Sequence, residues 1–331
     1  MGLFASTAWR ERAGRRVFSS RSAMADDKRA LCSLASCLTP LTPPLVSRLS
    51  RATAFLKSFS RIRMRRGLVL GGLAAGGYYA YSVTRPDTWE SHIPAGARRV
   101  EKLPNGVVSV SSPLWGMPDL RRMAVVPTAA GSIVFSPICL PDNELEAALG
   151  DHNVAVIVVP AAMHRLDAAM WKARFPDAKV VCPDGIRNTV SNKVGVDDCY
   201  SGVFCPGNAF GVTEIPAPMK PGANESALFV DSAGCLLVCD VIENIDVSHM
   251  PGPLRWMAQR YLVDNSDGLT MSYGFRHWMS LGSSEMKKWL ERLAAEAKAR
   301  NIQTLFVCHG APVHGANVDV SWEMTKLAEK L

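Results

Sequence analysis

The chain has 331 residues, and 48% of them are hydrophobic, which is enough to bury a core and excludes a wholly disordered protein. Its formal net charge of +7 is distributed unevenly. Residues 1–66 hold 14 Lys and Arg against 3 Asp and Glu, whereas residues 67–331 hold 23 basic and 27 acidic residues. The basic character therefore belongs to the N-terminal arm. Because the rest of the chain has a slight negative charge, we expect no nucleic-acid partner.

The arm over residues 1–66 is rich in Arg, Ser and Ala and poor in acidic residues. This composition is typical of an organellar transit peptide, and a disordered basic tail is the alternative interpretation. We expect a location at an organelle membrane, with the mitochondrion favoured and a plastid or another membrane as alternatives. The opening letters MGLFAS also match the pattern for N-terminal myristoylation, which is short and often occurs by chance.

Residues 67–83, GLVLGGLAAGGYYAYSV, contain no charged side chain and follow the basic stretch RIRMRR. A membrane-spanning helix needs about 17 to 25 apolar residues, so the segment has the minimum length. Its glycines recur at a spacing that lets membrane helices pack closely. We therefore expect a transmembrane helix that anchors the chain, with a buried helix of a soluble domain as the alternative. Residues 84–100 contain Pro86 and Pro94 and are expected to form a linker.

From residue 101 onward, short β-branched segments alternate with longer segments of helical periodicity. The strand segments are mostly apolar throughout, as is typical of sheets covered on both faces. We expect one α/β domain over residues 101–331. The predicted strands are GVVSVSS, SIVFSPI, AVIVVP, KVVCP, ALFVD, CLLVCDVI and TLFVCHG, and the predicted helices lie at 142–150, 166–174 and 284–300.

The nine cysteines are scattered, odd in number and without a C-x-x-C pair, which argues against a disulfide framework or a structural zinc site. Cys235 and Cys239 lie on a predicted strand, where they are interpreted as small hydrophobic residues. The segment PLRWMAQRYLV at 253–263 has an amphipathic pattern that favours packing against the core, with a lid, a membrane-facing strip or a partner helix as alternatives.

Polar side chains follow three of the predicted strands. His164 comes after VIVVP, Asp240 after CLLVC, and His309 with His314 in FVCHGAPVHG. A histidine or carboxylate just past a buried strand stands where open α/β sheets place ligands and catalysts. Each residue alone is more often a loop side chain with its hydrogen bonds satisfied, but the set together indicates a site.

The chain resembles a divergent, uncharacterised branch of the metallo-β-lactamase superfamily, known mostly as a domain of unknown function. The resemblance covers roughly residues 104–316. It rests on a strand that leads to the Pro-x-x-x-His loop of His164, a helix with Trp171 followed by Phe175 and Pro176, an Asp that ends a later strand, and the His-Gly pair at His309. The resemblance implies a four-layer αβ/βα sandwich with the site along one edge, between the two sheets.

The resemblance also implies a metal site, which this sequence matches only in part. Active members hold one or two metals, usually zinc, with a Thr-His-x-His-x-Asp-His loop, a later histidine, a bridging aspartate and a final histidine. His164 matches the second histidine of the loop, Asp240 the bridging aspartate and His309 the final histidine. Asp167 stands in place of the loop's last histidine. At the remaining positions this sequence has Ala161 for the threonine, Ala162 for the first histidine, Leu166 for the aspartate that commonly orients water and Ala223 for the later histidine, the last within a few residues.

Two hypotheses follow. In the first, the two-metal site is lost and a membrane-anchored organellar protein uses the degenerate domain for binding or as an accessory, with an unknown protein or a small molecule as partner and with no metal. In the second, His164, Asp167, Asp240 and His309 hold one Zn, Fe or Mn ion, because two imidazoles and two carboxylates suit any of these metals. The protein is then a metal-dependent hydrolase or oxidoreductase that acts on a small ester, thioester or sulfur-containing substrate. Without a metal, Asp167 and Asp240 are expected to repel one another, so that one of them takes up a proton or pairs with a cation such as Arg165 or Arg187.

Overall fold

The computed structural model describes residues 88–114, 117–248, 250, 252–261 and 268–331. The predicted arm at 1–66, the predicted transmembrane helix at 67–83 and the start of the predicted linker lie outside these residues. Within the described part of the chain, no helix combines the length and the apolar character needed to cross a membrane.

The first sheet has seven strands, whose order in space follows their order in the sequence. Strands β1 to β4 are antiparallel to their neighbours, whereas β4 to β7 are parallel. Their bounds are β1 Arg99–Lys102, β2 Val108–Leu114, β3 Met117–Val126, β4 Ser132–Phe135, β5 Val154–Val158, β6 Lys179–Cys182 and β7 Asp198–Cys199. Helices lie between the parallel strands, namely α5 Asp142–Leu149, α6 Ala168–Arg174 and α7 Arg187–Ser191, together with the 3-10 turns η2 Ala162–Arg165 and η3 Asp184–Ile186.

The second sheet has five strands in the order β12-β11-β10-β9-β8. Only β10 and β11 are parallel to each other, and the remaining pairs are antiparallel. The elements are α8 Tyr200–Val203, β8 Val212–Pro216, β9 Ser226–Val230, the 3-10 turn η4 Asp231–Ala233, β10 Cys235–Val238, α9 Gly252–Tyr261, the short π-helix η5 Phe275–Met279, α10 Ser283–Ala299, β11 Thr304–Val307, β12 Val313–His314 and α11 Val320–Glu329.

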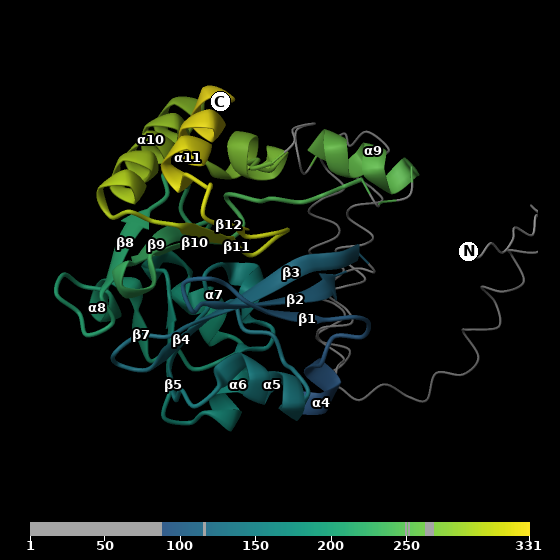
Figure 1. Ribbon diagram of the computed structural model, residues 1–331, viewed down its shortest axis with the longest axis vertical. Helices are drawn as coiled ribbons and strands as arrows, with labels where there is room; N and C mark the ends of the chain where they lie inside the picture. Colours follow the sequence, from purple (N-terminus) through teal and green to yellow (C-terminus); the bar gives the residue numbers. More distant parts are fainter. Residues whose placement is uncertain (1–87, 115–116, 249, 251, 262–267) are drawn as a thin grey trace, which may run out of the picture. The chain divides into compact units, whose positions relative to one another are not determined.

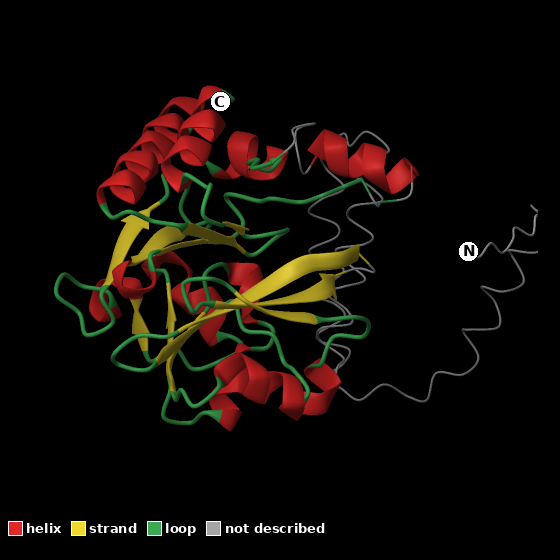
Figure 2. Ribbon diagram, viewed as in Figure 1, coloured by secondary structure: helices red, strands yellow, loops and turns green. Residues whose placement is uncertain are grey.

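The two sheets face one another, and helices cover their outer faces (Figures 1 and 2). Side chains alternate along each strand, so a central strand such as β5 contributes to two cores, with Val156 between the sheets and Ile157 on the outer side. Phe135 and Phe306 meet edge to face between the sheets, with ring centroids 6.2 Å apart. Trp171 of α6 packs on the outer side of the first sheet, and Leu290 of α10 packs on that of the second. The α/β prediction is confirmed, and the layers follow the order expected of an αβ/βα sandwich.

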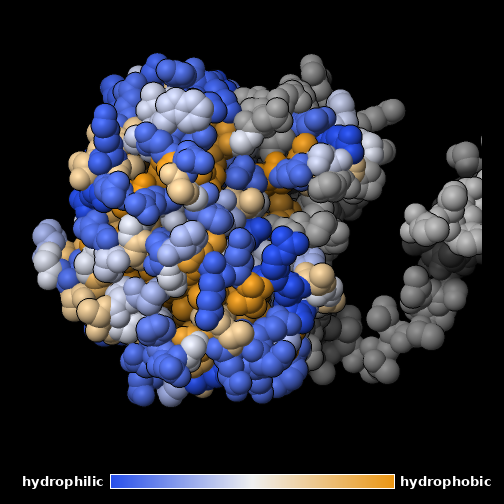
Figure 3. Space-filling view, viewed as in Figure 1, coloured by the Kyte–Doolittle hydropathy of each residue, from blue (hydrophilic) through white to orange (hydrophobic). Residues whose placement is uncertain are grey.

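The helical layers carry the hydrophilic surface of this domain. On the face seen in Figure 3, hydrophilic residues cover the helices at the top and bottom, and hydrophobic residues are visible mainly between them. All seven predicted strands and all three predicted helices are present, with their ends shifted by a few residues. The helical layers are thus amphipathic in the way their periodicity indicates.

The prediction of a linker over residues 84–100 is wrong from residue 88 onward. Helix α4, Trp89–His92, and the first residues of β1 pack on the domain. The Trp89 indole N–H donates to the Leu140 carbonyl at 2.6 Å, and Arg98 forms a bidentate ion pair with Glu144 at 2.8 and 2.9 Å. We call residues 88–98 the N-terminal strap. Short segments with two prolines indicate a linker by composition, but here side-chain contacts fix the backbone.

The predicted amphipathic segment at 253–263 is described up to residue 261, where it forms α9. Trp256 of this helix is 62% exposed, whereas Ala258 is buried. Amphipathic spacing indicates which residues share a face, but it does not determine which face meets the protein.

Candidate metal centre

The ends of strands from both sheets bring three of the predicted residues together. His164 lies in η2, which follows β5, while Asp240 and His309 each stand two residues beyond β10 and β11. Val238 and Val307 are paired in the parallel register of β10 and β11, so Asp240 and His309 leave the sheet at the same level. The hydrogen-bond ladder of the second sheet therefore places these two residues next to one another, and the first sheet supplies His164.

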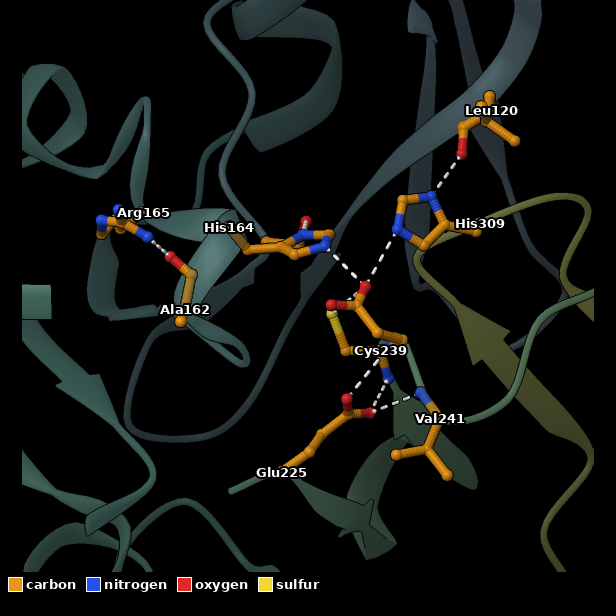
Figure 4. Close-up of polar contacts among 10 residues, drawn as sticks. Leu120, Ala162, His164, Arg165, Glu225, Cys239, Val241 and His309 are labelled. Carbon is orange, nitrogen blue, oxygen red and sulfur yellow. Dashed lines mark hydrogen bonds and ion pairs between the residues drawn. The ribbon is translucent and has the colours of Figure 1, made fainter. Parts of the chain in front are cut away.

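The three side chains converge on a single oxygen atom. The Asp240 Oδ1 atom lies 2.9 Å from His164 Nε2 and 2.9 Å from His309 Nε2 (Figure 4). The imidazole rings meet edge to face, with centroids 5.3 Å apart. The side chains of Asp240 and His309 are 12% and 15% exposed, whereas that of His164 is only 6% exposed, so the group reaches solvent through Asp240 and His309.

Each imidazole is held from behind through its other nitrogen. His164 Nδ1 lies 2.7 Å from Ser136 Oγ, and His309 Nδ1 lies 2.9 Å from the Leu120 carbonyl oxygen. Ser136 follows β4 and has a left-handed backbone with φ of 58°, which is uncommon for a residue other than glycine. Metal-binding histidines are usually oriented by such a second hydrogen bond, which also fixes the tautomer.

The contacts of His309 require a positive charge at this point. The Leu120 carbonyl can only accept, so Nδ1 must carry a proton and donate it. The Asp240 carboxylate also only accepts when ionised, yet Nε2 faces it at 2.9 Å. Either His309 is a doubly protonated imidazolium, or a cation bridges Nε2 and the carboxylate. A metal ion on two imidazole nitrogens and one carboxylate oxygen satisfies the same geometry.

Without a metal, the charges of the three groups support one another. Burial lowers the pKa of His164, but the Asp240 carboxylate outweighs this effect and raises the pKa to about 10. Burial likewise opposes the hydrogen bond and charge of Asp240 at His309, whose pKa is also raised. Burial raises the pKa of Asp240, but the two imidazoles hold it well below its usual value. The site is therefore suited to one positive charge or more beside Asp240.

Glu225, a residue that the sequence analysis missed, fixes the backbone that carries Asp240. Its carboxylate accepts the backbone N–H groups of Cys239, Asp240 and Val241 at 2.9, 3.0 and 3.2 Å (Figure 4). Glu225 is only 3% exposed. Burial and the Asp240 carboxylate raise its pKa, against the opposing effect of the N–H groups. The signal in the sequence was a charged residue directly before the fully buried strand β9.

Glu243 is a second buried carboxyl group near the centre. Its backbone N–H and carbonyl both pair with Thr270, and its Oε2 atom has no hydrogen-bond partner among the described residues. Burial raises its pKa to about 8, with the His309 imidazole lowering it and Asp240 raising it. Glu243 therefore lies within the electrostatic reach of His309 without forming an ion pair of its own.

Asp167 does not join the other three residues, which corrects the predicted fourth ligand. Its carboxylate lies 3.0 Å from His92 Nδ1 and 3.0 Å from a guanidinium nitrogen of Arg121, and it accepts the Cys139 N–H at 3.3 Å. Asp167 is fully buried in this cluster, which ties the N-terminal strap to α6. The expected repulsion between Asp167 and Asp240 is also wrong, because they belong to separate clusters. The Arg187 guanidinium instead contacts Cys199 Sγ and the Val196 carbonyl.

Ala162 and Ala223, which stand where histidine ligands were expected, make structural contacts. The Ala162 carbonyl accepts a hydrogen bond from the Arg165 guanidinium, and Ala223 packs against the core beneath α10. His314 lies 3.7 Å from Glu101, so its imidazole belongs to another contact. The centre is thus reduced to the donor set His164, Asp240 and His309, whose donor atoms all lie within 4.8 Å of one another.

Comparison with known proteins gives matches among solved structures. Neither the family models nor the curated proteins give a match. The chain resembles the metallo-β-lactamase FIM-1 from Pseudomonas aeruginosa, solved in the mono-zinc form, with 9% identity over 71% of this chain and 96% of that one and a TM-score of 0.46. Metallo-β-lactamases from Erythrobacter litoralis and Pontibacter korlensis are each 13% identical over 71% of this chain, with TM-scores of 0.43 and 0.42. The matched regions span 94% and 100% of those two chains, respectively. The likeness concerns the fold only.

Proposed function

We propose that the domain binds one divalent metal ion through His164, Asp240 and His309 and uses it in hydrolysis. The observation that carries this proposal is the set of contacts that His309 makes. Its Nδ1 atom donates to the Leu120 carbonyl, while its Nε2 atom faces the Asp240 carboxylate at 2.9 Å. A second proton on His309 or a cation satisfies this contact, and a divalent ion has the advantage of satisfying all three donors at once. Zinc, iron and manganese all accept such a mixed nitrogen and oxygen set.

Three protein ligands leave a coordination position for water, which is typical of catalytic rather than structural sites. A bound divalent ion supplies a hydroxide-like nucleophile at neutral pH and polarises a carbonyl oxygen. Asp240 and His309 remain partly exposed, so a substrate reaches the site from their side. We propose a small ester or thioester as the substrate class, with oxidoreductase chemistry on a sulfur-containing substrate as the alternative.

A second candidate function is a binding or accessory role without turnover. The specific observation in its favour is that Leu166 stands where active relatives are expected to have a water-orienting carboxylate. Asp167 cannot compensate for this loss, because Arg121 and His92 already hold its carboxylate. Under this candidate, the domain recognises a protein or a small molecule without hydrolysing it.

Metal analysis of the purified full-length protein tests the proposed function. We expect one ion per chain, and its loss in His164→Ala and in His309→Ala. His152→Ala is the matched control, because His152 is exposed and has no part in the centre. Hydrolysis of a panel of small ester and thioester probes by the loaded protein then separates the two candidates. If the protein contains no metal and the two variants fold and behave like the wild type, the metal-dependent function is wrong.

We also propose that residues 67–83 anchor the protein in an organelle membrane, with the mitochondrion favoured. Support comes from the uncharged 17-residue segment and the basic arm before it. Expression of the full chain and of a variant without residues 67–83, followed by alkaline carbonate extraction, tests this. We expect only the full chain to stay with the membrane fraction. Release of both forms would contradict the proposal.

A further inference from the structure

Two buried thiols lie side by side beneath the candidate metal centre. Strands β10 and β11 are parallel, with Val238 opposite Val307, and the next residues along the two strands are Cys239 and Cys308. Both cysteines are fully buried, and both belong to the core between the two sheets. Each is followed directly by a residue of the centre, Asp240 or His309. The same register that brings those two donors together therefore also brings the two sulfur atoms together.

The thiol pair meets His164. Donor atoms of His164, Cys239 and Cys308 all lie within 4.8 Å of one another, as do those of His164, Asp240 and His309. The Cys239 thiol also donates to Asp240 Oδ1 at 3.5 Å. His164 thus stands between an outer set of donors, which reaches solvent, and an inner set of two sulfurs, which does not.

The two sets differ in charge and softness. Two thiolates neutralise a divalent cation completely, so an ion bound at the inner set leaves no net charge in the buried interior, where unpaired charge is costly. Thiolates favour soft or borderline ions, whereas carboxylate and imidazole also accept manganese and iron. An imidazole with two thiolates therefore suits a divalent soft or borderline ion such as zinc or cadmium.

We propose that His164, Cys239 and Cys308 form a second, softer metal site, which competes with the outer set for a single ion. This inference rests on the proposed function only in sharing His164. Because His164 Nδ1 is held by Ser136, the ring offers only Nε2 and can bind one ion at a time. Soft ions therefore occupy the inner set, harder ions occupy the outer set, and both cannot be filled together.

Absorption spectroscopy with cadmium and manganese tests this proposal on the reduced full-length protein. Cadmium bound to thiolate gives an ultraviolet charge-transfer band, which neither imidazole nor carboxylate produces. We expect this band at one equivalent of cadmium, together with release of any manganese bound beforehand. In the double variant Cys239→Ser and Cys308→Ser, we expect loss of the band and cadmium affinity weakened roughly tenfold or more, with manganese binding unchanged.

The chain provides a matched control. Cys182 and Cys199 are a second buried pair, in register across β6 and β7, but their neighbour is the Arg187 guanidinium instead of an imidazole. A Cys182→Ser and Cys199→Ser double variant should therefore keep the band. His164→Ala should lose both ions, because both sets need it.

Two results would overturn the inference. One is stoichiometric cadmium binding by the native protein without a charge-transfer band, which needs no variant to fold. The other is simultaneous binding of one cadmium and one manganese ion. Removal of the outer donors by Asp240→Asn with His309→Gln separates this inference from the proposed function. If that variant keeps manganese, the proposed function fails, whereas loss of manganese with retention of the cadmium band supports both.

Discussion

The Glu225 carboxylate binds the backbone of Asp240 and not its charged side chain. The Glu225 carboxylate accepts the Asp240 backbone N–H at 3.0 Å, and it accepts the N–H groups on either side as well. One buried side chain thus holds the turn that presents Asp240 to both imidazoles. The arrangement of the three candidate donors therefore depends on this turn.

Removal of the Glu225 carboxylate should weaken both the fold and metal binding. In Glu225→Ala, three buried N–H groups lose their acceptor, and we expect a loss of about 2 to 5 kcal/mol in the free energy of unfolding. Metal affinity should fall roughly 10- to 100-fold, because Asp240 is no longer oriented. Glu225→Gln keeps one carbonyl oxygen and should fall between Glu225→Ala and the wild type. Denaturant titration and metal titration measure the two effects, and Glu285→Gln on the surface of α10 is the control.

The stability of the metal-free protein should depend on pH through His164 and Asp240. The folded pKa of His164, about 10, lies above the unfolded value of about 6.5, so its contribution is complete below pH 6.5 and is lost as the pH rises through 10. The pKa of Asp240 is lowered, so its contribution is present above about pH 4 and is lost at lower pH. Chemical unfolding in the presence of a chelator should show that the free energy of unfolding falls at both alkaline and acidic pH. The fall should be smaller in His164→Gln.

A bound metal ion should offset the loss of stability at alkaline pH. The ion must displace protons from the imidazoles, so its affinity rises with pH. We expect the stability difference between loaded and metal-free protein to grow between pH 6.5 and pH 9. A constant difference over this range would mean that the ion displaces no proton from His164.

Breaking the Asp167 cluster should destabilise the fold without changing metal affinity. Asp167→Asn removes the buried negative charge that the Arg121 guanidinium contacts at 3.0 Å, and we expect a loss of about 3 to 5 kcal/mol in the free energy of unfolding. The control Asp142→Asn removes a surface ion pair with Arg174, where Asp142 is 73% exposed, and should cost about 1 kcal/mol or less. A large drop in metal affinity for Asp167→Asn alone would restore Asp167 as a ligand.

Two substitutions at Ser136 separate backbone strain from hydrogen bonding. Ser136→Ala and Ser136→Gly both remove the hydroxyl that contacts His164, but only glycine relieves the left-handed backbone. We expect the glycine variant to be more stable than the alanine variant by about 1 kcal/mol, and metal affinity to fall equally in both. Equal stability of the two variants would show that the φ of 58° costs nothing here.

Much of the fold could be predicted from the sequence, because buried strands are continuous apolar runs. That reasoning placed His164, Asp240 and His309 at strand ends, where the sheet brings them together. It failed for Asp167, because a match by position in a loop does not show that Asp167 turns toward His92 and Arg121. It missed Glu225, whose role depends on N–H groups of a turn many residues away. The spacing at 253–263 likewise does not determine which face of the helix is solvated, and Trp256 of that segment is exposed.

The register of β10 and β11 has a consequence for how this protein can change. Asp240 and His309 are placed by paired strands, and the chain from the start of α9 to the end of α10 contributes none of the three donors. Insertions or deletions between the start of α9 and the end of α10 leave the donor atoms where they are, provided that the hydrogen bonds between β10 and β11 are kept. A single-residue insertion within either strand, in contrast, separates Asp240 from His309 and Cys239 from Cys308 at once. Changes in length are therefore expected to accumulate in the chain from α9 to α10, whereas the two strands are expected to keep a constant length.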